Sequence, residues 1–409
     1  MTPALLLDAA ERFGTPLYVY DAGTVQARCR ALTEALRGLP ARVLYAAKAN
    51  AAPALLRLIA AEGLGFDAVS PGEVAVLRAL GVPPGDILFT TTSTSDDELR
   101  WATEQGVLLN LDDAERVARL GALAPGAEVC VRVNPGVGAG HHRHVVTGGK
   151  ESKFGIRPED VPAVAETAAR TGLRVVGLHL HIGSGVDDPA VLREAAGALL
   201  DAAPHFPALR FVNLGGGLPV PYRPGEAPFD PARLRDEVAV PVLERLHATH
   251  PGTEVWFEPG RFVVAEAGVL LARVHTVKPA DGRVFVGTDS GFNHLIRPTL
   301  YGAYHALSNV SNPDGPLRTY DIVGNVCESG DLFARARRVQ EVRRGDVLAI
   351  HDTGAYGAAM ASTYNLRPLP AEALVGPDGT LRLTRARLSP EALAAEWLAA
   401  EEPVLEPAP

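Results

Sequence analysis

A single lysine, Lys48, stands among small residues in the segment YAAKAN (45–50), directly after an apolar run that begins at Val43. A lysine at a strand end can be an ordinary surface residue. An amine used as a nucleophile must instead be unprotonated part of the time, and burial near other cations favours this. Further reactive or glycine-rich positions follow later apolar runs in the same way: Asp67, Arg132, His179 and His181, Gly183 and Ser184, Gly215 to Gly217, and Glu258 to Arg261.

The glycine run Gly215, Gly216 and Gly217 and the segment IGSG (182–185) offer backbone amides that an anion can approach closely. The glycine run alone is equally an ordinary turn. Together with Ser184 and Arg261, it predicts a phosphate-binding cup. A lysine, a phosphate cup and an acid facing them suggest pyridoxal 5'-phosphate. Glu258 would hold the pyridine nitrogen so that the ring can take up electrons, although it could also form a salt bridge with Arg261.

Histidine pairs raise the alternative of a metal site, at HLH (179–181) and HHRH (141–144). We do not predict one, because a catalytic metal needs three well-placed ligands and no HExxH segment is present. Since residues alternate along a strand, we expect only one of His179 and His181 to face any given side. His181 could stack flat on a cofactor ring, and residues 141–144 could form a solvated loop or a substrate lid.

The elements that position these residues can be read from the apolar pattern. Eight short runs predict strands at 43–47, 65–69, 87–91, 107–111, 129–133, 175–180, 211–214 and 254–257. Helical segments rich in Ala, Leu and Arg separate them, among them 54–61, 73–80, 115–120 and 233–241. This alternation predicts an α/β protein with a (β/α)8 barrel, in which reactive residues gather at the carboxyl ends of the strands.

Beyond residue 268 the pattern changes to strands with few long helices. We therefore expect a barrel over 26–268 and a β-rich C-terminal domain over 269–409, which residues 1–25 join through a strand at 16–20. In that domain Cys327 and Glu328 lie side by side in the glycine-flanked segment GNVCESGDLF (324–333). Such a cysteine can donate a proton to a carbanion, although most cysteines are simply buried.

The bulk properties exclude several classes of protein. With 409 residues, 47% hydrophobic and 21% charged, the chain can bury a large core. A net charge of −9 argues against nucleic acid or an anionic membrane as a partner. We expect no signal peptide and no membrane span. Three scattered cysteines indicate a reducing cytoplasm, with no disulfide framework or cysteine zinc site.

The order of several motifs resembles the diaminopimelate decarboxylases, a family of pyridoxal-phosphate-dependent decarboxylases with an alanine-racemase-like barrel. The motifs, which span roughly residues 15–370, are YAAKAN, FDAVSPGE, SKFGI, HLHIGSG, NLGGGLP, EPGR, IRPTLYGAYH, VCESGDLF and GAYGAAMASTYN. The resemblance implies decarboxylation of meso-2,6-diaminopimelate to L-lysine and carbon dioxide, the last step of lysine synthesis. It also implies a homodimer with shared active sites, in which Cys327 and Glu328 reach into the partner's barrel.

Matched position by position, the resemblance assigns catalytic roles to Lys48, Cys327 (proton donor), His181 and Glu258. The implied cofactor-binding residues are Lys48, Asp67, His181, Ser184, Gly215, Gly216, Gly217, Glu258, Gly260, Arg261 and Tyr356. The implied substrate-binding residues are Arg261, Arg297, Tyr301, Glu328 and Tyr356. One departure is Pro219 after the glycine–leucine run, which has no N–H and is not assigned to phosphate.

Two kinds of alternative remain. The first is a related enzyme, such as a decarboxylase of L-lysine, ornithine or carboxynorspermidine, or an isomerase with a tyrosine in place of Cys327. The second is a pyridoxal-phosphate-binding relative without catalytic activity. Arg297 favours diaminopimelate, because a guanidinium can grip the distal carboxylate that lysine and ornithine lack.

Overall fold

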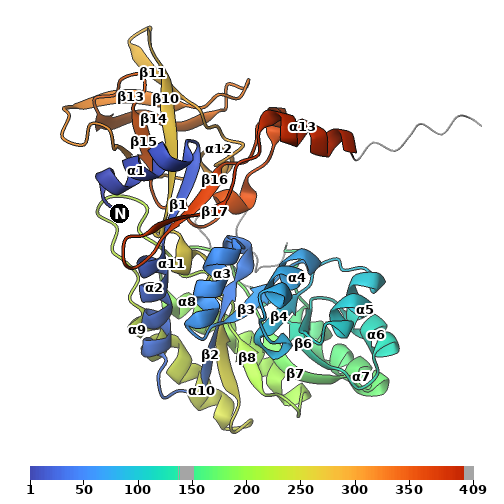
Figure 1. Cartoon of the computed structure of the whole chain (residues 1–409). Helices are drawn as coiled ribbons and strands as arrows, with labels where there is room; N and C mark the ends of the chain where they lie inside the picture. The colour runs from blue at the N-terminus through green and yellow to red at the C-terminus, as the bar shows by residue number, and fades with distance from the viewer. Residues whose placement is uncertain (137, 139–151, 400–409) are drawn as a thin grey trace, which may run out of the picture. The chain divides into compact units, whose positions relative to one another are not determined.

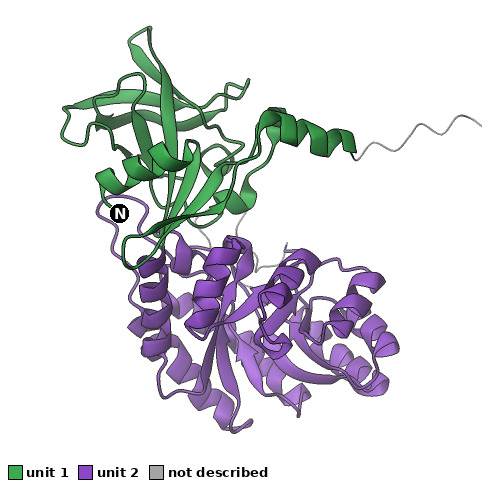
Figure 2. Ribbon diagram, viewed as in Figure 1, with its two compact units in different colours: residues 1–21, 267–409 green, residues 22–266 purple. Residues whose placement is uncertain are grey.

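The computed structural model describes residues 1–136, 138 and 152–399 of the chain. The chain forms two compact units, coloured separately in Figure 2. One unit is Ala22–Glu266, and the other combines Met1–Asp21 with Ala267–Pro409. The sequence pattern predicts these unit boundaries a few residues later, with the barrel over 26–268. The segment HHRH (141–144) lies outside the described residues.

The first unit is a closed barrel of eight strands, as the sequence predicted. Every neighbouring pair is parallel, and the last strand closes the barrel by pairing with the first through Val43 and Phe257. The strands are β2 (Ala41–Ala46), β3 (Gly65–Ala68), β4 (Ile87–Thr90), β5 (Leu108–Leu111), β6 (Glu128–Arg132), β7 (Arg174–His179), β8 (Phe211–Asn213) and β9 (Glu254–Phe257). Parallel strands are buried on both faces, which is why each reads as a continuous apolar run.

Helices follow the strands around the barrel (Figure 1). Most begin at a proline or at a Ser or Asp whose side chain accepts a hydrogen bond from the first turn, so the sequence itself starts them. Among the described residues of this unit, the α-helices are α2 (Ala22–Ala35), α3 (Pro53–Ala61), α4 (Pro71–Ala79), α5 (Asp96–Glu104), α6 (Ala114–Leu123), α7 (Val161–Thr171), α8 (Pro189–Ala202), α9 (Pro231–Leu234), α10 (Val240–His247) and α11 (Arg261–Val264), with a π-helical turn at Arg235–Ala239 between α9 and α10.

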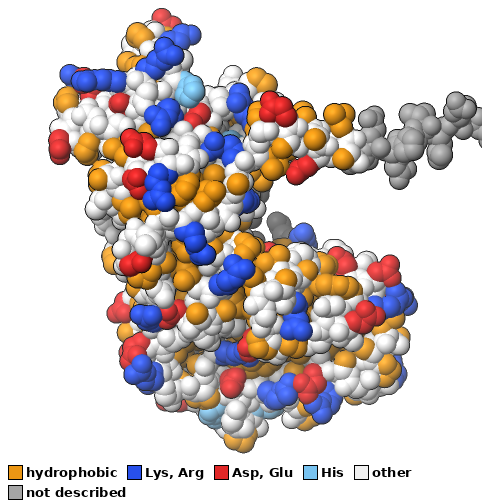
Figure 3. Space-filling model, viewed as in Figure 1, with side chains coloured by type: hydrophobic (Ala, Val, Ile, Leu, Met, Phe, Trp, Pro, Cys, Tyr) orange, Lys and Arg blue, Asp and Glu red, His pale blue; other side chains and the backbone are white. Residues whose placement is uncertain are grey.

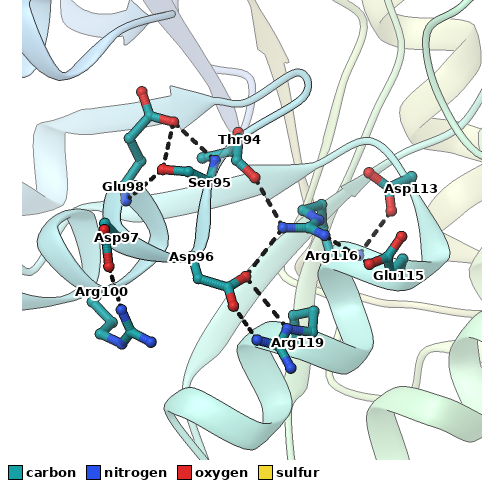
Figure 4. Close-up of polar contacts among 10 residues, drawn as sticks. All are labelled: Thr94, Ser95, Asp96, Asp97, Glu98, Arg100, Asp113, Glu115, Arg116 and Arg119. Carbon is teal, nitrogen blue, oxygen red and sulfur yellow. Dashed lines mark hydrogen bonds and ion pairs between the residues drawn. The ribbon is translucent and has the colours of Figure 1, made fainter.

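Polar contacts join α5 to α6 (Figure 4). Ser95 caps α5 by accepting from the backbone N–H of Glu98, whose carboxylate returns a hydrogen bond to the Ser95 N–H. Asp96 then accepts from Arg116 and Arg119 of α6, and Arg116 also donates to the Thr94 carbonyl at 2.9 Å. These contacts lie on the outside of the barrel, where exposed ion pairs add little stability, so they set the helix geometry more than the fold's free energy.

The barrel interior is apolar towards the amino-terminal ends of the strands. The Phe211 and Trp256 rings stack with centroids 3.7 Å apart, within a cluster that also contains Leu44, Leu88, Cys130 and Val176. Gly177 is required beside them, because a Cβ there would lie 2.0 Å from the Phe211 ring. This packed layer closes the amino end of the barrel and leaves the carboxyl ends of the strands for polar residues.

The second unit is built on a nine-stranded mixed sheet. The strand expected near the N-terminus joins it as predicted: β1 (Leu17–Asp21) runs antiparallel to β10 (Gly268–Ala280) and parallel to β16 (Ala371–Val375). The remaining strands are β11 (Arg283–Thr288), β12 (Leu307–Asn309), β13 (Leu317–Val323), β14 (Leu332–Gln340), β15 (Val347–Ile350) and β17 (Leu381–Arg385).

The described residues of this unit include three α-helices: α1 (Pro3–Phe13), α12 (Arg297–Tyr301) and α13 (Pro390–Ala399). Leu6, Ala9 and Ala10 of α1 pack on the sheet with Val19 and Val269. No described helix is long and apolar enough to cross a membrane. On the face shown in Figure 3, acidic and basic side chains are interspersed.

Candidate active site

A ring of polar side chains lies at the carboxyl ends of the barrel strands. Each of the eight strands contributes one, either from its last residues or from the turn that follows. In strand order they are Lys48, Asp67, Thr90, Asn110, Arg132, His179, Asn213 and Glu258. All except Lys48 are buried, so each needs a partner inside the barrel.

Lys48 belongs to one half of this ring. Its Nζ lies 3.2 Å from Asp67 Oδ2, and Asp67 Oδ1 accepts from the Thr90 hydroxyl at 2.6 Å. Asn110 in turn donates to Thr90 at 3.3 Å. Burial and the charge of Glu258 raise the pKa of Asp67, and Lys48 partly opposes this. The Lys48 side chain is 36% exposed, so its amine can be reached while its charge partner is fully buried.

Glu258 is the centre of the other half. His179 Nε2 lies 3.0 Å from Glu258 Oε2, and Asn213 Nδ2 donates to Oε1 at 2.7 Å. Burial alone would raise the pKa of Glu258, but His179 and Lys48 outweigh it and bring the pKa down to about 2. The structure therefore holds an ionised carboxylate in a buried position.

A cradle of glycines lies next to Glu258. A Cβ at Gly216 would come within 2.2 Å of the Glu258 carbonyl oxygen. The corresponding Cβ atoms at Gly215 and Gly217 would lie 2.6 Å from the carbonyls of Leu180 and Gly183. Gly215 and Gly217 also have φ of +68° and +104°, which favour glycine. These residues are glycines because other backbone segments pass directly over them.

Ser184 and Arg261 stand beside this cradle. Arg261 donates to the Ser184 hydroxyl from Nε at 3.2 Å and from Nη2 at 2.9 Å, and to the Tyr222 hydroxyl at 2.8 Å. Gly260 must also be small, because a Cβ there would lie 2.9 Å from the Ala49 Cβ of the YAAKAN segment. The alanines around Lys48 thus let the ends of β2 and β9 approach each other.

His181 lies just beyond the end of β7, since this strand stops at His179. Its Nδ1 accepts from the Gly216 N–H at 3.2 Å, which leaves the proton on Nε2. Burial and the charges of Lys48 and Arg132 lower the pKa of His181 well below its usual value. The expectation that the two histidines face different sides does not follow from a strand, because residues two apart share a face and only His179 is in β7.

The donor set fits pyridoxal 5'-phosphate. An accessible lysine amine suits its aldehyde, and glycine amides with a serine hydroxyl and a buried guanidinium suit its phosphate. The ionised carboxylate of Glu258 suits a protonated pyridine nitrogen, and a neutral imidazole at His181 suits a flat ring.

The remaining predicted residues, Arg297, Tyr301, Cys327, Glu328 and Tyr356, belong to the other unit, and we describe them there by themselves. Cys327 is exposed, with Sγ 3.5 Å from Asn365 Oδ1. Glu328 accepts a short hydrogen bond from the Tyr364 hydroxyl. The turn that carries both residues is held by Asp331, which accepts from the N–H groups of Phe292 and Val326, each at 2.7 Å.

Arg297 starts α12 and is almost completely buried. Its Nη1 lies 2.8 Å from His305 Nε2, and His305 Nδ1 lies 2.8 Å from the His351 carbonyl. Because a carbonyl can only accept, Nδ1 carries the histidine proton and Nε2 accepts from Arg297. Tyr301 ends the same helix, and Tyr356 has a φ of +56°, an uncommon conformation for a tyrosine.

Sequence reasoning missed several partners of the predicted residues. His179 was flagged only as half of a histidine pair, and Asn213, Tyr222, His305 and Asp331 were not singled out. Each acts through a contact that is distant in sequence, such as the 79 positions between His179 and Glu258. A weak signal existed for Asn213 and His179, since both stand at predicted strand ends, where polar residues in a barrel gather.

Comparison with known proteins agrees with this chemistry. Residues 22–265 match the family model described as pyridoxal-dependent decarboxylase, pyridoxal binding domain. A diaminopimelate decarboxylase from Methanothermobacter thermautotrophicus is 42% identical over 93% of this chain and 91% of its own length.

Solved structures are similar too. The diaminopimelate decarboxylase from Helicobacter pylori complexed with L-lysine has a TM-score of 0.89 at 31% identity, covering 97% of this chain and 100% of the other. The lysine/ornithine decarboxylase from Vibrio vulnificus complexed with putrescine has a TM-score of 0.80 at 25% identity, covering 92% and 98%. The chain therefore belongs to the pyridoxal-dependent decarboxylases, and within them to the diaminopimelate decarboxylase family.

Proposed function

We propose that this protein converts meso-2,6-diaminopimelate to L-lysine and carbon dioxide with pyridoxal 5'-phosphate as cofactor. The observation that carries the proposal is the buried, ionised Glu258 in the same barrel mouth as the reachable amine of Lys48. The near-full-length similarity to diaminopimelate decarboxylases supports the choice of substrate. One relative, from Helicobacter pylori, was solved with L-lysine, the product proposed here.

The cofactor, when bound, supplies an electron sink for the pair left on Cα as the carboxylate departs. Lys48 would hold its aldehyde carbon and Glu258 its pyridine nitrogen. Asp67 would keep the Lys48 amine in place, and His181 would lie against the ring. The phosphate would be held by Ser184, Gly215, Gly216, Gly217, Gly260, Arg261 and Tyr356.

Proton delivery is assigned to Cys327. A thiol that returns a proton to Cα must be reachable, and Cys327 is the exposed cysteine while Cys29 and Cys130 are buried. Asp331 and Asn365 support this role, because they fix the turn and contact the thiol sulfur. An exposed free thiol also favours a reducing compartment such as the cytoplasm.

Substrate selection is assigned to Arg261, Arg297, Tyr301, Glu328 and Tyr356. A guanidinium can bind the distal carboxylate bidentately, and Glu328 can bind the distal ammonium. Lysine and ornithine lack that carboxylate and would leave a buried arginine without its anion. Such a site can discriminate by about 10⁴-fold.

We further propose that the working form is a homodimer in which Cys327 and Glu328 complete the partner's barrel site. Apolar side chains around this pair support the proposal: Leu300, Tyr364 and Leu366 are 45%, 43% and 52% exposed. Tyr364 bonds to Glu328 directly, and Thr299, next to Leu300, donates to the Gly330 carbonyl at 2.9 Å. Exposed apolar groups around functional polar residues are typical of an interface.

The test of the reaction is an assay of carbon dioxide release from meso-diaminopimelate, L-lysine and L-ornithine. We expect diaminopimelate to be turned over by far the fastest, and Arg297→Ala to weaken this preference. Faster turnover of ornithine would overturn the choice of substrate. Cofactor binding with no release from any of the three would instead identify a non-catalytic relative.

Mixing two inactive variants tests the shared site. In the proposed dimer each site combines Lys48 from one chain with Cys327 from the other. The variants Lys48→Ala and Cys327→Ala each remove one of these two residues. Random mixing makes about half of the dimers mixed, each with one intact site, so about a quarter of the activity should return. No recovery after verified chain exchange would contradict the shared site without touching the reaction itself.

A further inference from the structure

His179 is a buried histidine whose described side-chain contact is with Glu258. We propose that His179 is a positioning residue, which holds Glu258 ionised and in a fixed plane for the cofactor's pyridine nitrogen. This inference rests on the proposed function, because it assigns a task to a residue through the cofactor site. His179 itself need not touch the cofactor or the substrate.

The geometry is that of a carboxylate held from both sides. His179 Nε2 lies 3.0 Å from one Glu258 oxygen, and Asn213 Nδ2 lies 2.7 Å from the other. Because an ionised carboxylate only accepts, the proton of this contact is on His179 Nε2. Asn213 is fixed in turn, since its Oδ1 accepts from the Gly215 N–H at 2.9 Å. One donor on each oxygen sets the plane of the carboxylate and leaves lone pairs for a further donor.

The surroundings explain why Glu258 needs such support. Burial opposes its charge, and Asp67, another buried acid, lies close enough for each to affect the other. The basic side chains that face Glu258 are Lys48, Arg132, His179 and His181, and Cys130 is a further titratable neighbour. Of these, His179 makes the direct hydrogen bond. His181 is engaged elsewhere, because its Nδ1 accepts from Gly216.

The other nitrogen of His179 argues against a purely structural role. His179 Nδ1 is buried and has no hydrogen-bond partner among the described residues. A buried polar atom without a partner costs stability, and an apolar side chain at this position in the barrel would avoid that cost. A histidine placed here is therefore better explained by what its Nε2 does for Glu258 than by packing.

The variants His179→Leu and His179→Gln separate these explanations. Leucine fills the space without a donor, whereas the glutamine amide nitrogen can take the place of Nε2. The matched control is His247→Leu, in helix α10 of the same unit. His247 Nε2 also contacts an oxygen, the Thr253 carbonyl at 2.8 Å, and leucine removes that contact. Folding of each variant is checked by circular dichroism and urea unfolding before any binding is measured.

The main readout is the dissociation constant of pyridoxal 5'-phosphate from the cofactor-free protein, measured by quenching of intrinsic fluorescence between pH 6 and 8. We expect His179→Leu to weaken binding by about 10- to 100-fold, the range for a lost hydrogen bond to a charged group. Without His179 the pKa of Glu258 should rise, so the ratio of variant to wild-type dissociation constants should grow as the pH falls. Glutamine should restore most of the affinity and remove the pH trend, and the His247 control should match wild type.

The outcomes separate the two proposals. If wild type binds the cofactor and releases carbon dioxide, but folded His179→Leu binds as tightly as wild type at every pH, the positioning role is wrong and the proposed function stands. If leucine and glutamine weaken binding equally and without a pH trend, the role is structural and the inference is again wrong. If the wild-type protein neither binds pyridoxal 5'-phosphate nor releases carbon dioxide, the proposed function is wrong, and the inference about His179, which rests on it, is wrong too.

Discussion

Asp331→Asn is the substitution whose effect the structure specifies most closely. Asp331 is buried, and each of its carboxylate oxygens accepts one backbone N–H, from Phe292 and from Val326, at 2.7 Å. Its own backbone closes the same turn, since its N–H donates to Glu328 at 3.0 Å and its carbonyl accepts from Gly324 at 3.2 Å. The residue thus holds the turn on which Cys327 and Glu328 are carried.

Asparagine keeps one acceptor oxygen and puts an NH2 group where the other oxygen was. One buried N–H then faces a donor, which costs about 1–3 kcal/mol, and one hydrogen bond to a charged group is lost, worth about 1.5–3 kcal/mol. Burial raises the pKa of Asp331, so part of this loss is offset because a neutral amide is easier to bury. We expect a net destabilisation of about 2–3 kcal/mol.

Two measurements check this expectation. The free energy of unfolding in urea should fall by the stated amount, and kcat should fall more than KM rises, because displacement of Cys327 affects the chemical step. The control is Asp321→Asn, since Asp321 is buried in the same unit and accepts from the Ala336 N–H at 2.6 Å, but between β13 and β14. It should lose stability and keep kcat. An Asp331→Asn enzyme with unchanged stability and unchanged kcat would refute the reasoning.

Three further predictions follow from single residues. In Gly216→Ala the new Cβ would lie 2.2 Å from the Glu258 carbonyl oxygen, so one of the two must move by about 1 Å. Cofactor affinity and kcat should therefore each fall by up to about 100-fold. Gly197→Ala is the control, because a Cβ there meets open space and should change neither quantity. Cys327→Ala should lower kcat far more than it raises KM in steady-state assays, and a fully active variant would remove the proton-donor assignment. Burial lowers the pKa of His294 to about 4. As the pH falls below about 6.5, this histidine is protonated in the unfolded chain but stays neutral in the native protein. Stability should therefore drop by about 2 kcal/mol between pH 7 and pH 5, and urea unfolding of His294→Gln should show a smaller drop.

The barrel could be predicted from the chain because its strands are buried on both faces. Apolar runs such as the one before Lys48 end within one or two residues of the observed strands, and polar residues follow them at the carboxyl ends. The strand at 16–20 was also recognisable, as was its membership of the C-terminal unit. Helix α1 was not predicted, although Thr2 and Pro3 form an ordinary helix start, with Thr2 accepting from the Leu5 N–H at 3.3 Å.

The contacts of the site could not be predicted in the same way. Strand alternation does not put His179 and His181 on different sides, because residues two apart on a strand share a face. Moreover, β7 stops at His179, so strand geometry does not place His181. The salt bridge considered for Glu258 named Arg261, whereas the described partners of Glu258 are His179 and Asn213.

The sequence by itself determined which residue types are available and which element each one follows, because local propensity and apolar periodicity act over a few neighbouring residues. It was enough to put a lysine, a glycine run and an acid at the ends of barrel strands. Only the tertiary structure decided how those groups are charged and held. The ionised state of Glu258 depends on a histidine 79 positions away and on burial by the whole barrel, and such long-range electrostatics exist only after the strands have closed.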